Sequence, residues 1–161
     1  MRRAFRCRRI AALVCVVGCV GVACGVGSPP PPISQASLVA HWANDEGVRI
    51  AFASDHTLRA VGLDHAPGAE AGSCPAATKG RWDFFGPVND SGSSSSDESL
   101  TRGGMIAVHG KDGKDGKDDT CTFIAVTRKD GQAFGLCLAQ DPEPVCTDDE
   151  TLRRSRPVRS R

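Results

Sequence analysis

The chain has 161 residues, eight of them cysteine, and carries 20 Lys and Arg against 19 Asp and Glu. The balance is uneven, because residues 25–150 hold ten basic and nineteen acidic residues, a net charge of −9. Such an acidic body argues against a nucleic-acid-binding domain, which presents a basic face, so no nucleic-acid partner is expected.

The first 24 residues have the pattern of a lipoprotein signal peptide. Five arginines form a cationic start, and residues 10–22 form an apolar run. About 13 helical residues span ~20 Å, short of the ~30 Å hydrocarbon core of a bilayer. A cleaved signal is therefore favoured over a permanent transmembrane anchor. The pair Arg2-Arg3 leaves the Sec and twin-arginine export routes open.

Two cysteines near the end of the apolar run are candidates for lipid attachment. Small residues precede Cys24, and aliphatic residues precede Cys19. We expect diacylation at Cys24, with Cys19 as the alternative, because Cys24 leaves a full-length apolar run. A signal peptide cut near Ala23 without lipid stays open. The protein is then exported and either lipid-anchored at the outer face of the cytoplasmic membrane or secreted.

Composition divides the rest of the chain into a tether, a β domain and a tail. Residues 25–36 are rich in Gly and Pro and predict a tether, with the β domain at 37–152 and a basic tail at 153–161. Within the domain, residues 89–103 are Ser-rich and acidic, and residues 109–120 repeat Gly-Lys-Asp. Both segments lack the apolar area that offsets ordering entropy, so both are predicted to be disordered loops.

Two segments of the body predict β-hairpins. Apolar residues alternate with others from Val48 to Phe52, and Ser54–Thr57 turns the chain into a second strand from Leu58. Residues 121–127 and 133–138 flank Asp130-Gly131, where glycine supplies the positive φ of a tight turn.

Shorter apolar runs bounded by Gly, Pro or Asn predict further strands at 38–43, 80–85 and 105–109. No long amphipathic helix is expected after residue 28, although residues 146–154 can form one or two helical turns. The fold class is therefore all-β: a small antiparallel meander or partly open barrel of at most seven strands. The predicted inward residues are Trp42, Ile50, Phe52, Leu58, Trp82, Phe123, Leu136 and Leu138.

Four cysteines lie in the exported part: Cys74, Cys121, Cys137 and Cys146. In an exported small domain an even number of cysteines indicates disulfides. An even-numbered hairpin loop at Asp130-Gly131 puts Cys121 and Cys137 on opposite faces, which disfavours that pairing. Of the two remaining connectivities, the Pro-containing bend before Cys146 favours Cys137–Cys146 with Cys74–Cys121.

No motif predicts an enzyme, a metal site or a cofactor. Gly-x-Ser-x-Gly, a phosphate-binding glycine loop, His-Glu-x-x-His and Cys-x-x-Cys are all absent from the sequence. The aspartates of residues 112–119 do not have calcium-loop spacing. His41, His109, the pair Asp64-His65 and Asp83 are interpreted as surface polarity.

Four motifs follow in order: Leu-Val-Ala-His-Trp at 38–42, Ser-Asp-His-Thr-Leu at 54–58, Gly-Arg-Trp at 80–82, and paired cysteines before Leu-Arg-Arg at 152–154. They resemble a group of small uncharacterised actinobacterial secreted lipoproteins, and the opening strand is similar to that of lipocalin-type β-meanders. The resemblance implies a small β domain and carries no known activity.

The expected function is that of a non-enzymatic cell-envelope lipoprotein. Its β domain would be held at the membrane by the lipid anchor and would present an edge or loops to an envelope protein or polymer. The alternative is a lipocalin-like carrier of a small apolar ligand. An empty interior above roughly 300 Å³ would favour the carrier.

Overall fold

The structure, a computed structural model, describes residues 28–67, 74–89, 93–111, 121–139 and 146–155. The predicted signal peptide, with Cys19 and Cys24, lies outside the described residues, as does the tail from residue 156. No helix in the described ranges has the length and apolar character of a membrane span.

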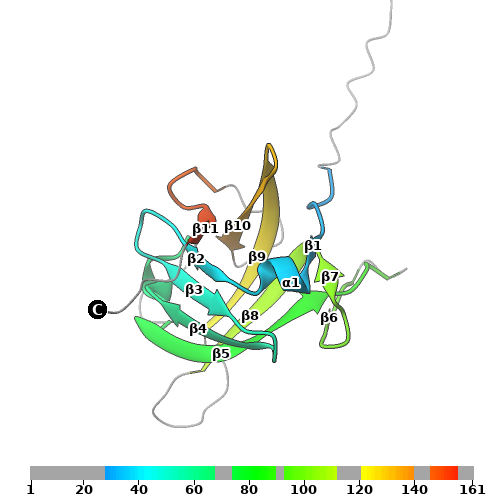
Figure 1. The fold of residues 1–161 in the computed structure, drawn as a ribbon. Coiled ribbons are helices and arrows are strands. Elements are labelled where there is room, and N and C mark those ends of the chain that lie inside the picture. Colours follow the sequence, from blue (N-terminus) through cyan, green and yellow to red (C-terminus); the bar gives the residue numbers. More distant parts are fainter. Residues whose placement is uncertain (1–27, 68–73, 90–92, 112–120, 140–145, 156–161) are drawn as a thin grey trace, which may run out of the picture.

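Eight antiparallel strands form a closed barrel (Figure 1). They are β2 (His41–Ala43), β3 (Arg49–Phe52), β4 (Thr57–Val61), β5 (Ala77–Phe85), β8 (Met105–Lys111), β9 (Cys121–Asp130), β10 (Ala133–Ala139) and β11 (Leu152–Ser155). Each strand pairs with its neighbour in the chain, and β11 pairs with β2 to close the barrel. The predicted all-β meander is confirmed. The barrel is closed rather than partly open, and its strand count exceeds the predicted seven.

Both predicted hairpins are present. In the β3–β4 hairpin Phe52 pairs with Leu58, and His56 in the turn has a φ of 63°. In the β9–β10 hairpin Asp130 pairs with Ala133, which leaves a two-residue loop that starts at Gly131, with a φ of 58°. A glycine at the first loop position is typical of a type II′ turn, whose twist matches that of the strands.

The eight residues predicted to point inward are all buried. Alternation along each strand sends them into the barrel, where they form one cluster with Phe84, Ile106 and Leu152. Two T-shaped contacts extend through this cluster, from Trp82 to Phe52 and to Phe84. Trp42 is fixed by its indole N–H, which donates to the Leu38 carbonyl at 2.8 Å.

One end of the barrel is covered by the N-terminal segment. Here β1 (Ile33–Ser34) pairs with β7 (Arg102–Gly103), and α1 (Gln35–Leu38) begins at the N-cap Ser34. Ile33 and Leu38 are buried in the core cluster, which orders the segment. The expected limit of the tether at residue 36 therefore needs correction. The strand predicted at 38–43 begins only at His41, because Leu38 ends α1.

The Ser-rich segment predicted as a disordered loop at 89–103 also needs correction. It contains β6 (Ser96–Asp97), which pairs with the end of β5, and β7, which pairs with β1. These two short strands are polar and have little apolar area to bury. Backbone pairing with β1 and β5 orders them instead. The second predicted loop, 109–120, begins later than expected, since β8 extends to Lys111, and residues 112–120 lie outside the described residues.

The opposite end is covered by the connection between β4 and β5. It contains the 3₁₀-helix η1 (Leu63–His65), and it buries Leu63, Ala66 and Cys74 in the core cluster. The Cys74–Cys121 disulfide joins this connection to the first residue of β9. The favoured pairing of these two cysteines is therefore present.

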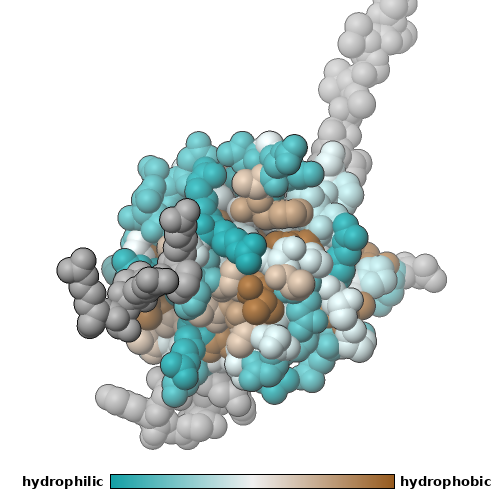
Figure 2. Space-filling view, viewed as in Figure 1, coloured by the Kyte–Doolittle hydropathy of each residue, from teal (hydrophilic) through white to brown (hydrophobic). Residues whose placement is uncertain are grey.

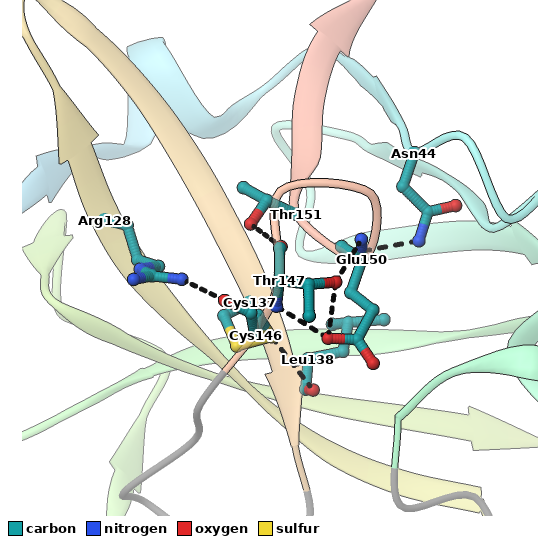
Figure 3. The surroundings of a disulfide bond; sticks show 8 residues. All are labelled: Asn44, Arg128, Cys137, Leu138, Cys146, Thr147, Glu150 and Thr151. Atoms are coloured by element: carbon teal, nitrogen blue, oxygen red, sulfur yellow. Dashed lines mark hydrogen bonds between the residues drawn. A yellow bond between two sulfur atoms is a disulfide. The ribbon is translucent and has the colours of Figure 1, made fainter.

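The second predicted disulfide, Cys137–Cys146, lies on the outer face of β10 (Figure 3). Thr147 and Glu150 follow it and cap each other, since the Thr147 N–H donates to Glu150 Oε2 at 2.7 Å. The Thr151 N–H donates to the Thr147 carbonyl at 3.2 Å, so one of the helical turns expected at 146–154 forms. It ends where β11 begins, at Leu152. Arg153 and Arg154 belong to β11 rather than to a tail. Pairing of β11 with β10 and β2 holds these two residues in the sheet.

Candidate functional site

The barrel interior is occupied by side chains. Twelve large side chains are almost fully buried, and both tryptophans and two phenylalanines are among them. Hollows of about 770, 520 and 330 Å³ are lined by residues of the outer wall or of the covered end. The interior of a small eight-stranded barrel is just wide enough for side chains or one small ligand, and here side chains take the space.

The outer faces of β3, β4 and β5 carry a group of cations that we call the basic wall. Its members are Arg49, Arg59, Lys79 and Arg81, all of them exposed. Alternation turns all four outward, because the residues next to them along the strands are buried, except the half-buried Gly80.

The register brings two members of the basic wall together. Arg59 pairs directly with Lys79 across β4 and β5. Arg81 donates to Glu98 at 2.6 Å, whereas Arg49, Arg59 and Lys79 have no ion pair within the described ranges. Like charges directly opposite each other in a sheet are destabilising, so this arrangement costs the fold some stability.

A shallow groove of about 770 Å³ runs along the same two strands. Three wall cations line it together with Val61, whose side chain is 52% exposed, and Ala77. The groove therefore combines positive charge with a small apolar strip. It is suited to an anionic partner that also offers apolar contacts, because unpaired cations on a low-dielectric wall concentrate positive potential there.

A second cluster connects the β3–β4 turn with β5 and α1. His56 Nδ1 lies 3.1 Å from Asp83 Oδ1 and 3.0 Å from the Trp82 carbonyl oxygen. Its ring stacks on Trp82 with centroids 4.5 Å apart, and its Nε2 lies 3.4 Å from Gln35 Nε2. The His56 and Asp83 side chains are only 15% and 12% exposed.

This histidine cluster fixes the fold at the covered end of the barrel. His56 adopts a left-handed φ that costs free energy in a residue other than glycine, and its four contacts hold it there. Its other ring nitrogen contacts the Gln35 amide rather than a hydroxyl or thiol, so the pair activates no nucleophile among the described residues. No local pattern indicates this cluster, because His56 and Asp83 stand 27 residues apart in the chain.

The other candidate polar residues stay separate. His41 is exposed at the start of β2, and His109 is half-buried opposite Arg81. The His65 ring lies 3.6 Å from the carboxylate of its neighbour Asp64, its one ion-pair partner among the described residues. Across the described residues, no group of three or more His, Cys, Asp or Glu side chains is arranged to hold a metal ion.

Comparison with models of protein families, with curated proteins and with solved structures found nothing that matches this chain. The functional assignment therefore rests on the chain's own geometry, in which the basic wall is the most distinctive surface.

Proposed function

We propose that this protein is a non-enzymatic, lipid-anchored binding module of the cell envelope, and that the basic wall holds an anionic envelope protein or polymer. Export and lipid attachment are supported by the arginine-rich start, the short apolar run and Cys24 with its alternative Cys19. The Gly/Pro-rich residues after Cys24 would separate the barrel from the membrane surface.

The observation that carries the proposal is the direct pairing of Arg59 with Lys79. Residues 25–150 include nearly twice as many acidic as basic residues. Yet the exposed charged residues of the three adjacent strands β3, β4 and β5 are all cations. An acidic partner would relieve the repulsion between these cations when it binds. Wall cations would also speed its capture by long-range attraction.

The lipocalin-like alternative has less support. Both tryptophans and the phenylalanines Phe52, Phe84 and Phe123 fill the barrel, which leaves little room for an interior ligand. A surface that binds by charge does not need such a cavity.

Capture from envelope extracts tests the role of the basic wall. The double variant Arg59→Ala/Lys79→Ala removes two wall cations, and Arg102→Ala/Lys129→Ala removes two exposed cations elsewhere, with the same change in net charge. We expect the partner to be captured by wild type and by the control variant and lost from the wall variant. Equal capture by all three proteins would contradict the proposal.

Mass analysis tests the anchor. Protein extracted from membranes should carry a lipid adduct on an N-terminal cysteine, at Cys24 or else at Cys19. A secreted form that starts after Ala23 with an unmodified thiol would contradict lipid attachment, while leaving the wall proposal intact.

A further inference from the structure

A second hollow lies where the covered end of the barrel meets β10, β11 and β2. It has a volume of about 330 Å³, at the lower end of the range for small-molecule sites. We call it the rim pocket, and its lining is Ile33, Ser37, Trp42, Gln132, Ala133, Phe134, Arg153 and Arg154. Figure 2 shows apolar atoms gathered in the middle of the face on which α1 and β2 lie, with hydrophilic atoms around them.

The floor of the rim pocket is apolar. Ile33 and Trp42 are core residues, and Phe134 is half-buried and packs against the core. The one polar atom of the Trp42 ring is already used, because its indole N–H donates to the Leu38 carbonyl at 2.8 Å. The floor therefore offers carbon surface to a ligand.

The rim of the pocket is cationic. Arg154 pairs with Trp42 across β11 and β2, so its side chain starts from the same face of the sheet as the Trp42 ring. Arg154 is exposed and has no ion pair or side-chain hydrogen bond within the described ranges. Arg153 faces the other way, with its guanidinium 3.4 Å from Asp130 and 3.6 Å from Asp148.

We propose that the rim pocket binds a small amphipathic carboxylate, with its apolar body against Trp42 and Phe134 and its carboxylate at Arg154. No Asp or Glu is among the described residues that line the pocket, so no carboxylate of this lining opposes an anion. A guanidinium binds a carboxylate through two parallel hydrogen bonds, and Gln132 and Ser37 add polar side chains at the rim. This site is separate from the basic wall, and neither proposal depends on the other.

The volume limits the ligand. A pocket of about 330 Å³ holds a medium-length acyl chain or a single aromatic ring system with its acid group, but not a second chain. An inorganic anion would make no contact with the apolar floor. A neutral alcohol with the same chain length as the carboxylate would form no ion pair with Arg154. Affinity should therefore require both halves of the molecule.

Calorimetric titration of the mature protein with decanoate, decanol and acetate tests the site. Wild type should bind decanoate at least about tenfold more tightly than decanol, since a hydrogen bond to a charged group is worth that much. Acetate should show no binding in the same range. Failure of decanoate to bind, or equal affinity for decanoate and decanol, would overturn the proposal.

Three variants locate the binding. Arg154→Gln should weaken the affinity for decanoate by about tenfold or more and leave the affinity for decanol unchanged. Arg153→Gln should have a much smaller effect, because the Arg153 guanidinium already pairs with two aspartates. Ala133→Trp, at an exposed position of the pocket, should block both ligands by filling the space. Unchanged decanoate affinity in Arg154→Gln and Ala133→Trp would place any binding elsewhere and overturn the proposal.

Discussion

Arg59 of β4 and Lys79 of β5 lie directly opposite each other in the sheet, and both side chains are exposed on the outer wall. Sheet stability alone would favour opposite charges at such a pair. Residues 25–150 hold nineteen acidic and ten basic residues and still place two cations here. The stability of the fold therefore does not explain this pair, whereas the proposed anionic partner would.

Lys79→Glu should therefore stabilise the protein while it abolishes binding at the basic wall. The change replaces a repulsive cross-strand pair by an attractive one, worth about 0.5–1 kcal/mol, or roughly 2–6 °C in Tm. Thermal unfolding at low and high salt checks this, because screening should shrink the gain at 1 M salt. A lower Tm for the variant at low salt would show that the two side chains do not interact across the strands.

Phe123→Ala should unfold or nearly unfold the domain. Phe123 is only 1% exposed inside the barrel, and loss of a buried phenylalanine costs about 3–5 kcal/mol. The adjacent Thr122 is exposed, so Thr122→Ala is the control and should change stability by no more than about 0.5 kcal/mol. Thermal unfolding compares the two variants. A Phe123→Ala protein that melts within a degree or two of wild type would show that the inward face of β9 is wrongly assigned.

The two disulfides should differ in their contribution to stability. Cys74–Cys121 closes a chain separation of 47 residues and Cys137–Cys146 one of 9. Loop-closure entropy then gives about 4 kcal/mol for the first and about 3 kcal/mol for the second. Denaturant unfolding of the two double-serine variants measures the loss in the free energy of unfolding for each disulfide. We expect the variant that lacks Cys74–Cys121 to be the less stable one.

Peptide mapping under non-reducing conditions checks the connectivity itself. The expected linked fragments join Cys74 to Cys121 and Cys137 to Cys146. A fragment that joins Cys121 to Cys146, or Cys74 to Cys146, would show that the β9–β10 register or the bend before Cys146 is incorrect.

Stability should fall in acid partly because of Glu150. Hydrogen bonds from the backbone and side chain of Thr147 hold the pKa of Glu150 below its ordinary value of 4.5. A carboxyl whose pKa is lower in the folded state stabilises the fold above its unfolded pKa, and this contribution disappears as pH falls through the folded pKa. Glu150→Ala should therefore lower Tm at neutral pH, and its difference from wild type should narrow below about pH 4.5.

Thermal melts between pH 7 and pH 3 measure this narrowing. Glu46→Ala is the control, because Glu46 is exposed in the β2–β3 turn and makes no ion pair or hydrogen bond across the described ranges. A Glu150→Ala difference that stays constant over the whole pH range would show that the Thr147 contacts do not persist in solution.

The parts of the fold that follow from local patterns were predictable. Alternation over Val48–Phe52 and the glycine at 131 are signals within a few residues, and they determine two hairpins and the face that each strand buries. The same register excluded the Cys121–Cys137 pairing, because the two-residue loop separates the faces of these cysteines. The Pro-containing bend before Cys146 then decided between the two remaining pairings.

The parts that depend on distant partners were not predictable. Ile33 is ordered by pairing with Gly103, seventy residues later in the chain, and residues 152–155 become a strand only because β10 and β2 flank them. Short segments with few apolar residues give no periodic signal of their own. The net negative charge of residues 25–150 likewise concealed the basic wall, because a net charge sums over all faces of the barrel. The outward positions of the predicted strands, read separately, would have indicated it.

Titration with an acidic polymer tests the account most directly. Polyglutamate provides repeated carboxylates without any particular envelope origin, and its affinity is measured for wild type, Arg59→Ala/Lys79→Ala and Arg102→Ala/Lys129→Ala. We expect wild type and the control variant to agree within about twofold and the wall variant to bind about tenfold or more weakly, with all affinities falling as salt rises. An equal loss in both double variants would mean that net charge alone governs binding and would contradict the basic wall as a site.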